Sequence, residues 1–149
     1  MSSEPTASSM ASTVVVVEDD DDIREAVCEA LHAEGYPTAE ACNGRDALDM
    51  LHALRERPGL ILLDLMMPTM DGWEFLRNID RDAEMRDIPV AVMSAHPSIQ
   101  HALEDDLNSC GFTRLLLPKP LDFFRLLSFV RSVVGARSTY PRLSDLQST

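Results

Sequence analysis

The feature that most constrains the fold is a short apolar run, Leu60–Leu63, which ends in a single carboxylate at Asp64. An apolar run of this length, bounded by turn residues, is typical of a strand buried on both faces, as in a parallel sheet. A second run, Val14–Val17, leads into Glu18 and Asp19 in the same way. Two such strands predict one shared acidic pocket at the carboxyl edge of the sheet, where open α/β sheets bind their ligands.

Strand-like and helix-like patterns alternate along the chain, which predicts five β-α repeats. The strands are expected at Thr13–Val17, Tyr36–Ala41, Leu60–Leu63, Pro89–Met93 and Leu115–Leu117. Helical spacing of apolar residues follows each strand, with helices expected from Asp21 to before Gly35, from Ala47 to before Pro58, and over Trp73–Ile79, Pro97–Ser109 and Phe123–Val134. The alternation indicates an α/β fold with a doubly wound five-stranded parallel sheet and helices on both faces.

The length of 149 residues fits one domain with short tails. Residues 1–12 offer almost no apolar surface, so they are predicted to be a disordered tail, with the domain at 13–136 and a polar tail at 137–149. The formal net charge of -12 argues against nucleic acid or an anionic membrane as a direct partner. No apolar stretch approaches the roughly 20 residues that span a bilayer.

The cysteines and the amino-terminal residues indicate the cytoplasm. Cys28, Cys42 and Cys110 are odd in number and lack the spacing of a metal site or a redox pair, so they are expected to be reduced and partly buried. The amino-terminal residues do not show the basic and apolar regions of a signal peptide.

The ends of four predicted strands carry chemically useful side chains. They are Glu18 and Asp19 after the first strand, Asp64 after the third, Ser94 after the fourth and Lys119 after the fifth. Neighbouring carboxylates repel one another, and a hard divalent cation such as Mg²⁺ relieves that repulsion through oxygen ligands. The pattern therefore predicts a Mg²⁺ site at this edge.

Asp64 has a second possible role as a nucleophile that accepts a phosphoryl group. Phosphoryl transfer needs charge neutralisation more than it needs a base, and Mg²⁺, the Lys119 ammonium and the Ser94 hydroxyl supply that together. Taken singly, the serine reads as a turn residue and the lysine as a surface residue. For Asp20–Asp22, a solvated helix amino terminus explains the charge equally well.

In these residues the chain resembles the receiver domain of response regulators in two-component signalling, of the stand-alone chemotaxis type. The resemblance spans about Thr13–Gly135. Its motifs are Val16–Asp20, Gly35-Tyr36, Ala41–Leu48, Leu63–Gly72, Ser94-Ala95 and Lys119-Pro120.

The resemblance implies a flavodoxin-like fold with Asp64 as phosphoacceptor. It implies that Asp19, Asp64 and the Met66 carbonyl ligate Mg²⁺, with Glu18 acting through bound water. Ser94 and Lys119 would contact the phosphoryl oxygens, and the Lys119–Pro120 peptide would be cis. The expected partners are a histidine kinase or phosphotransfer protein and a downstream protein target. Such a receiver is not an enzyme beyond promoting its own phosphorylation and dephosphorylation.

Two positions depart from the family pattern. Leu116 stands where the family usually has the aromatic partner of the Ser/Thr switch, so a response through the helix after Ser94 alone is an alternative. His96 lies where the family tunes access of water to the phosphoryl group, and an exposed loop residue explains it equally well.

Three functions remain in view. A phosphoacceptor receiver is the leading hypothesis. The alternative is a phosphorylation-independent docking module with the same fold. A phosphohydrolase fits less well, because Leu65 and the two residues after it provide no acid/base carboxylate. Two apolar sets are predicted to pack on the sheet: Ile23, Val27 and Leu31, and Phe123, Phe124 and Phe129.

Overall fold

The structure is a computed structural model of the chain, and it describes residues 13–54, 57–65, 67, 69–94 and 114–135. The side chains of residues 94, 114–116 and 118 are not among the described atoms. The predicted tails, and the predicted helix over Pro97–Ser109, lie outside the described residues. No helix in the described ranges is long and apolar enough to cross a membrane.

Five parallel strands form one sheet in the order β2-β1-β3-β4-β5. The predicted fold is confirmed, and each strand lies within a residue or two of its expected position. The strands are β1 (Val14–Val17), β2 (Thr38–Ala41), β3 (Leu60–Asp64), β4 (Val90–Ser94) and β5 (Arg114–Pro118).

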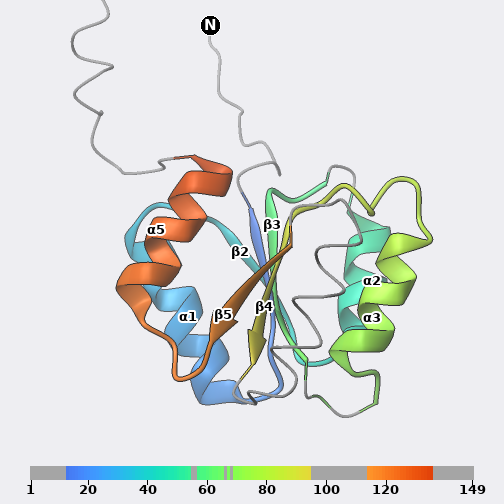
Figure 1. The fold of residues 1–149 in the computed structure, drawn as a ribbon, viewed down its shortest axis with the longest axis horizontal. Helices are drawn as coiled ribbons and strands as arrows, with labels where there is room; N and C mark the ends of the chain where they lie inside the picture. The colour runs from blue at the N-terminus through green and yellow to red at the C-terminus, as the bar shows by residue number, and fades with distance from the viewer. Residues whose placement is uncertain (1–12, 55–56, 66, 68, 95–113, 136–149) are drawn as a thin grey trace, which may run out of the picture.

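Within the described residues, four helices cover the two faces of the sheet, α1 and α5 on one face and α2 and α3 on the other (Figure 1). Each begins at a side chain that accepts hydrogen bonds from the first turn, at Asp20, Asn43, Asp71 and Asp122 respectively. The helices are α1 (Asp21–Ala33), α2 (Gly44–Ala53), α3 (Gly72–Asp80) and α5 (Phe123–Val134).

The strand residues alternate between two apolar cores. Val15, Val17, Ile61 and Leu63 face α2 and α3, whereas the strand residues between them face α1 and α5. β1 and β3 are buried at every position, which is the burial expected of central strands in a parallel sheet. The prediction that both runs form strands buried on both faces is therefore confirmed.

The prediction of which helix residues pack on the sheet is confirmed for α1 and wrong in part for α5. In α1, Val27 and Leu31 are fully buried and Ile23 packs partly against the same core. The prediction for α5 is wrong at its first two positions, because Phe124 is 81% exposed and Phe123 is 38% exposed.

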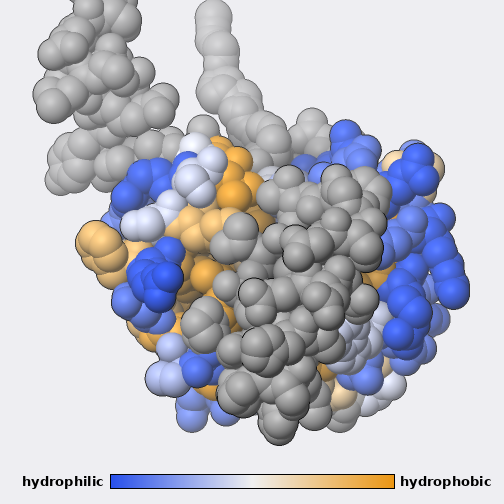
Figure 2. Space-filling model, viewed as in Figure 1, coloured by the Kyte–Doolittle hydropathy of each residue, from blue (hydrophilic) through white to orange (hydrophobic). Residues whose placement is uncertain are grey.

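The buried positions of α5 are Leu126 and Val130, one turn apart. Phe124 lies two residues before Leu126, which places it on the opposite side of a helix with 3.6 residues per turn. Phe129 contacts the core only partly. Figure 2 shows apolar side chains on the surface where α5 lies in Figure 1.

The cysteine prediction is correct in part. Cys28 and Cys42 are free thiols, but Cys28, a residue of α1, is buried in the core, whereas Cys42 is exposed just after β2. The Cys42 thiol donates a hydrogen bond to Asp46 at 2.9 Å, and this contact raises the pKa of Cys42. Cys110 lies outside the described residues.

Candidate functional site

The acidic residues meet where the chain reverses its direction of winding through the sheet. β1 is followed by β2 on one side and β3 on the other, so the crevice between the ends of β1 and β3 is the topological switch point. Val17 pairs with Leu63 in register, which brings the next residues, Glu18 and Asp64, to the same level. Strand topology thus places two carboxylates that are far apart in the sequence beside each other.

Three carboxylates form the cluster, and one ammonium group faces them. Carboxylate oxygens of Glu18, Asp19 and Asp64 lie within 4.8 Å of one another. Glu18 and Asp64 are buried, and Asp19 is exposed. The Lys119 Nζ lies 3.0 Å from the Glu18 Oε1 and 3.6 Å from the Asp64 Oδ1. The lysine therefore bridges the two buried acids, with its shorter contact to Glu18.

The electrostatics of the cluster follow from this burial. Burial and a hydrogen bond with Asp64 raise the pKa of Glu18 to about 7, against the opposing effect of Lys119. Burial alone would lower the pKa of Lys119, but its hydrogen bond to Glu18 and the charge of Asp64 raise that pKa above its ordinary value. The ammonium therefore stays charged, and ionisation of Glu18 increases the excess of negative charge in the cluster.

The donor set fits a hard divalent cation. Three carboxylates against one ammonium leave net negative charge in a partly buried site, and oxygen is the donor that Mg²⁺ prefers. The exposed Asp19 leaves one side of the cluster open to solvent, where an ion that keeps several waters can enter. Glu18, Asp19 and Asp64 are the described residues that could hold it.

The loop after Asp64 is held by two close backbone contacts. The Gly72 N–H donates to the Leu65 carbonyl at 2.9 Å, and a Cβ on Gly72 would lie 2.6 Å from the Leu65 Cα. The Gly44 N–H, at the start of α2, donates to the Met70 carbonyl at 3.1 Å. Thr69 has a φ of 70°, a conformation that non-glycine residues rarely adopt. The loop conformation is thus imposed from α2 and α3.

The remaining predicted site residues are described in part or not at all. Ser94 ends β4, where its backbone pairs with Pro118, the residue before Lys119, but its side chain lies outside the described atoms. Met66 and His96 also lie outside the described residues. The Lys119–Pro120 peptide is cis, as the family resemblance implies. Leu116 belongs to β5, and its side chain is not among the described atoms either.

The acidic residues after Asp19 form the amino-terminal cap and first turn of α1. Asp20 is the amino-terminal cap of α1 and accepts hydrogen bonds from the Asp22 and Ile23 amides. Asp21 and Asp22 occupy the first turn, where the helix dipole favours negative charge. The reading of Asp20–Asp22 as a helix amino terminus is confirmed for the local structure.

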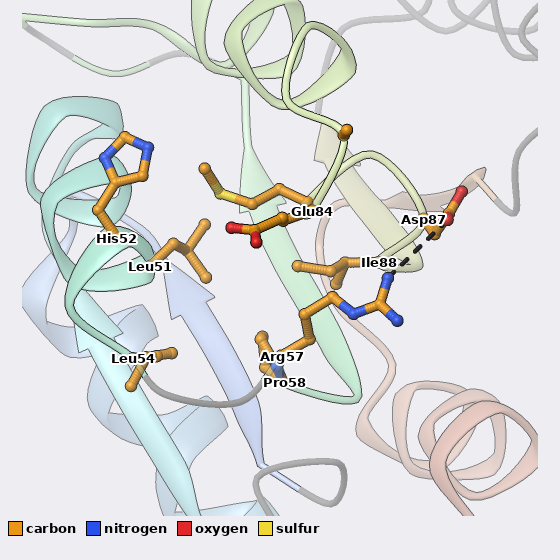
Figure 3. A pocket seen from close by; sticks show the side chains of 10 residues that line it. Leu51, His52, Leu54, Arg57, Pro58, Glu84, Asp87 and Ile88 are labelled. Atoms are coloured by element: carbon orange, nitrogen blue, oxygen red, sulfur yellow. Dashed lines mark ion pairs between the residues drawn. The ribbon is translucent and has the colours of Figure 1, made fainter.

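A separate pocket of about 700 Å³ lies at the opposite edge of the sheet. Its lining comes from the end of α2 and from the segments that precede β3 and β4, and Figure 3 shows Leu51, Ile88 and Arg57 around it. Arg57 pairs with Asp87 at 3.8 Å, both more than half exposed. Because its lining residues precede the strands, this pocket is remote from the carboxylates and takes no part in their chemistry.

Sequence reasoning missed one residue that contacts the cluster. Arg24, on α1, donates a hydrogen bond to the backbone carbonyl of Glu18 at 2.7 Å. The sequence offered one sign of this contact, an arginine one turn into the helix that follows the acidic run. A charged residue at such a position usually lies on the solvent-exposed side of a helix.

Comparison with known proteins gives a consistent result. Residues 14–131 match the family model of the response regulator receiver domain. Among curated relatives, the response regulator MprA of Mycolicibacterium vanbaalenii is 32% identical over 120 residues, which cover 80% of this chain and 48% of that protein. The MprA of Mycobacterium avium is 33% identical over 120 residues, which again cover 80% of this chain and 48% of that protein. The chain thus spans about half the length of these relatives.

Solved structures share the fold. The signal receiver domain of a histidine kinase from Syntrophus aciditrophicus is 26% identical with a TM-score of 0.72, covering 89% of this chain and 96% of that one. The chemotaxis response regulator CheY4 of Vibrio cholerae is 28% identical with a TM-score of 0.71, covering 82% and 98%. The receiver domain of a Pseudomonas aeruginosa sensor histidine kinase, described with a magnesium ion in its active-site cleft, is 24% identical with a TM-score of 0.70, covering 84% and 98%.

Proposed function

Because the chain belongs to the response regulator receiver domain family, we propose that it accepts a phosphoryl group on Asp64 from a histidine kinase or phosphotransfer protein. The observation that carries the proposal is the buried Asp64 carboxylate, which lies at the switch point with two further carboxylates and the Lys119 ammonium around it. A histidine-bound phosphoryl group is the donor, and the new charge on Asp64 is the signal.

In the transfer, an oxygen of Asp64 attacks phosphorus. The bond between phosphorus and the donor histidine nitrogen breaks, and its electron pair returns to that nitrogen. Asp64 attacks as the carboxylate, so no base is needed to remove a proton from it. Lys119 is positioned 3.6 Å from the Asp64 carboxylate and supplies positive charge next to the phosphoryl oxygens. Lys119 therefore neutralises charge that the transfer brings to Asp64.

We assign Glu18, Asp19 and Asp64 to the Mg²⁺ site, with the Met66 carbonyl carried over from the family resemblance. When bound, Mg²⁺ supplies charge neutralisation for the phosphoryl oxygens that Lys119 does not face. We assign the Ser94 hydroxyl to a third phosphoryl oxygen. Supporting the metal assignment are the excess of carboxylates over ammonium in the cluster and the magnesium ion described in the Pseudomonas aeruginosa receiver.

The output is a changed surface that a downstream protein target binds. Phosphorylation adds charge beside Lys119 and biases the segments that follow β4 and β5. With Leu116 at the position usually held by an aromatic residue, the response runs through the segment after Ser94. We place the domain at 13–136 between two tails, and the chain in the cytoplasm without nucleic acid as a direct partner.

Phosphorylation of the purified chain tests the proposal. Incubation with a small acyl phosphate and Mg²⁺ is expected to add one phosphoryl group, detected by mass spectrometry of the intact protein. Asp64→Asn is expected to abolish the addition. Asp49→Asn, an exposed aspartate on α2, is the matched control and is expected to be phosphorylated normally.

Phosphoryl incorporation that survives Asp64→Asn would contradict the proposal. The alternative is a phosphorylation-independent docking module. It predicts no incorporation in the wild-type chain, and a partner affinity that Asp64→Asn leaves unchanged.

A further inference from the structure

Arg24 ties together three segments at the carboxyl edge of the sheet. From the first turns of α1, its guanidinium donates to the Glu18 carbonyl at 2.7 Å and to the Glu40 carboxylate on β2 at 3.1 Å. It also pairs with Asp21 on its own helix. The side chain is only 16% exposed, which is unusual for an arginine in a helix that follows an acidic loop.

The contact to the Glu18 carbonyl has consequences for the carboxylate cluster. The Glu18 N–H is held by the Ala41 carbonyl of β2 at 3.0 Å, and the Glu18 carbonyl is held by Arg24. The peptide that joins Glu18 to Asp19 therefore cannot rotate without losing a charge-assisted hydrogen bond. This peptide links the Cα atoms that carry the two carboxylates, so the contact from Arg24 is made to the peptide plane that contains both of these Cα atoms.

The two ion pairs of Arg24 explain the burial of its side chain less well than its contact to the Glu18 carbonyl does. The side chain of Asp21 is 83% exposed and that of Glu40 is 50% exposed. Ion pairs with exposed partners contribute little to stability. The bond to the main-chain carbonyl is the contact that reaches the cluster.

We propose that Arg24 is a positioning residue of the divalent-cation site. It acts through the Glu18 carbonyl, which holds the Glu18–Asp19 peptide in the orientation that brings both carboxylates to the ion. The inference deepens the proposed function and rests on it, because the ion is the Mg²⁺ of the phosphoacceptor site. Groups that support a ligand in this way commonly change metal affinity about tenfold or more when removed.

The sign of the effect separates positioning from simple charge. Arg24 is a positive group near the cluster, so removing its charge alone would make Mg²⁺ bind more tightly. Loss of positioning makes Mg²⁺ bind more weakly. Arg24→Met keeps most of the aliphatic stem and removes the guanidinium, so it tests the two effects in one variant.

The experiment is a calorimetric titration of the full chain with Mg²⁺ alone. Arg24→Met is expected to weaken binding on the order of tenfold. Arg24→Lys, which can still reach one acceptor, is expected to recover part of the loss and is the second variant should the first not fold. Arg131→Met is the matched control, because it removes the Arg131 contact to Glu34, which lies at the end of α1 remote from the cluster. Glu40→Gln keeps the carbonyl contact and is expected to retain nearly wild-type affinity.

Two outcomes overturn the inference alone. One is a wild-type chain that binds Mg²⁺ while Arg24→Met binds it equally well or more tightly. The other is Glu40→Gln losing as much affinity as Arg24→Met, which would make the whole ion-pair network responsible. A wild-type chain that binds no Mg²⁺ would instead overturn the metal assignment, and this inference with it.

Discussion

The two edges of the sheet carry charge in different ways. At the carboxyl edge, two buried carboxylates and one exposed carboxylate share a single ammonium. At the amino edge, basic and acidic side chains pair one to one: Arg57 with Asp87 at 3.8 Å, and His52, an ion-pair partner only when protonated, with Asp82 at 3.6 Å. The first arrangement is unbalanced and buried, whereas the second is balanced and largely exposed.

The difference in burial and charge balance between the two edges indicates which edge carries the functional site. Burying like charges costs free energy that packing elsewhere must offset, so such a cluster persists where its charge is used. Exposed pairs cost little and contribute little. The pocket of about 700 Å³ at the amino edge is therefore a weaker sign of function than the carboxylate cluster.

The largest expected effect is a pH dependence of stability that arises at the carboxyl edge. Glu18 has a pKa of about 7 in the folded chain and an ordinary value of 4.5. Between these values the folded state holds a proton that the unfolded state has lost, so the free energy of unfolding falls as the pH rises. The slope reaches at most about 1.4 kcal/mol per pH unit.

Urea unfolding in the absence of divalent cations, between pH 4.5 and pH 7.5, measures this slope. Glu18→Gln is expected to remove the contribution. A wild-type slope that persists in Glu18→Gln would assign the effect to another group and weaken the contrast between the edges.

The second effect compares the two cations directly. Lys119→Met leaves Glu18 and Asp64 buried without their counter-charge, and is expected to lower the free energy of unfolding by about 2–3 kcal/mol at pH 8 without metal. Arg57→Met at the amino edge is expected to cost less than about 0.5 kcal/mol. Chemical denaturation of both variants tests the pair, and equal losses would contradict the proposed difference between the two edges.

A third effect concerns backbone strain in the loop after Asp64. Thr69 is exposed and has a φ of 70°, and within the described ranges it is the one non-glycine residue with a positive φ. Thr69→Gly is expected to stabilise the chain by about 0.5–1 kcal/mol, because relief of the left-handed strain exceeds the extra entropy of glycine in the unfolded state. Thermal unfolding measures it. A lower melting temperature would show that the Thr69 side chain makes a stabilising contact.

The smallest effect is expected at His52. Its pair with Asp82 is long and the His52 side chain is 60% exposed. His52→Gln is therefore expected to change the free energy of unfolding by less than about 0.5 kcal/mol at pH 6. Denaturation at pH 6 and pH 8 checks this, and a loss at pH 6 comparable with that of Lys119→Met would place a functional charge at the amino edge.

Much of the fold could be predicted from the sequence because local signals and tertiary packing agree. The runs Val14–Val17 and Leu60–Leu63 are apolar at every position, which is typical of a central strand of a parallel sheet, where every position is buried. The caps at Asp20 and Asp122 mark helix starts by side-chain chemistry that acts within three residues. These features need no knowledge of distant contacts.

The prediction that failed, burial of Phe123 and Phe124, required knowledge of which side of α5 packs against the sheet. Phe124 is apolar and lies in a helix, but nothing local says that Leu126 and Val130 are the residues that meet the sheet. Which residues of α5 are buried depends on how the helix packs against α1 and β3, and those contacts join distant parts of the sequence. An exposed aromatic side chain is the result.

The sequence by itself determined the order of the elements and the residues that end the strands, because hydrophobic periodicity and capping are local properties. Only the tertiary structure decided which of those ends meet. The register of β1 on β3 puts Glu18 beside Asp64, Lys119 reaches Glu18 across about a hundred residues of sequence, and Arg24 closes on the Glu18 carbonyl. These contacts depend on strand order and burial, which the chain acquires only when the sheet is assembled.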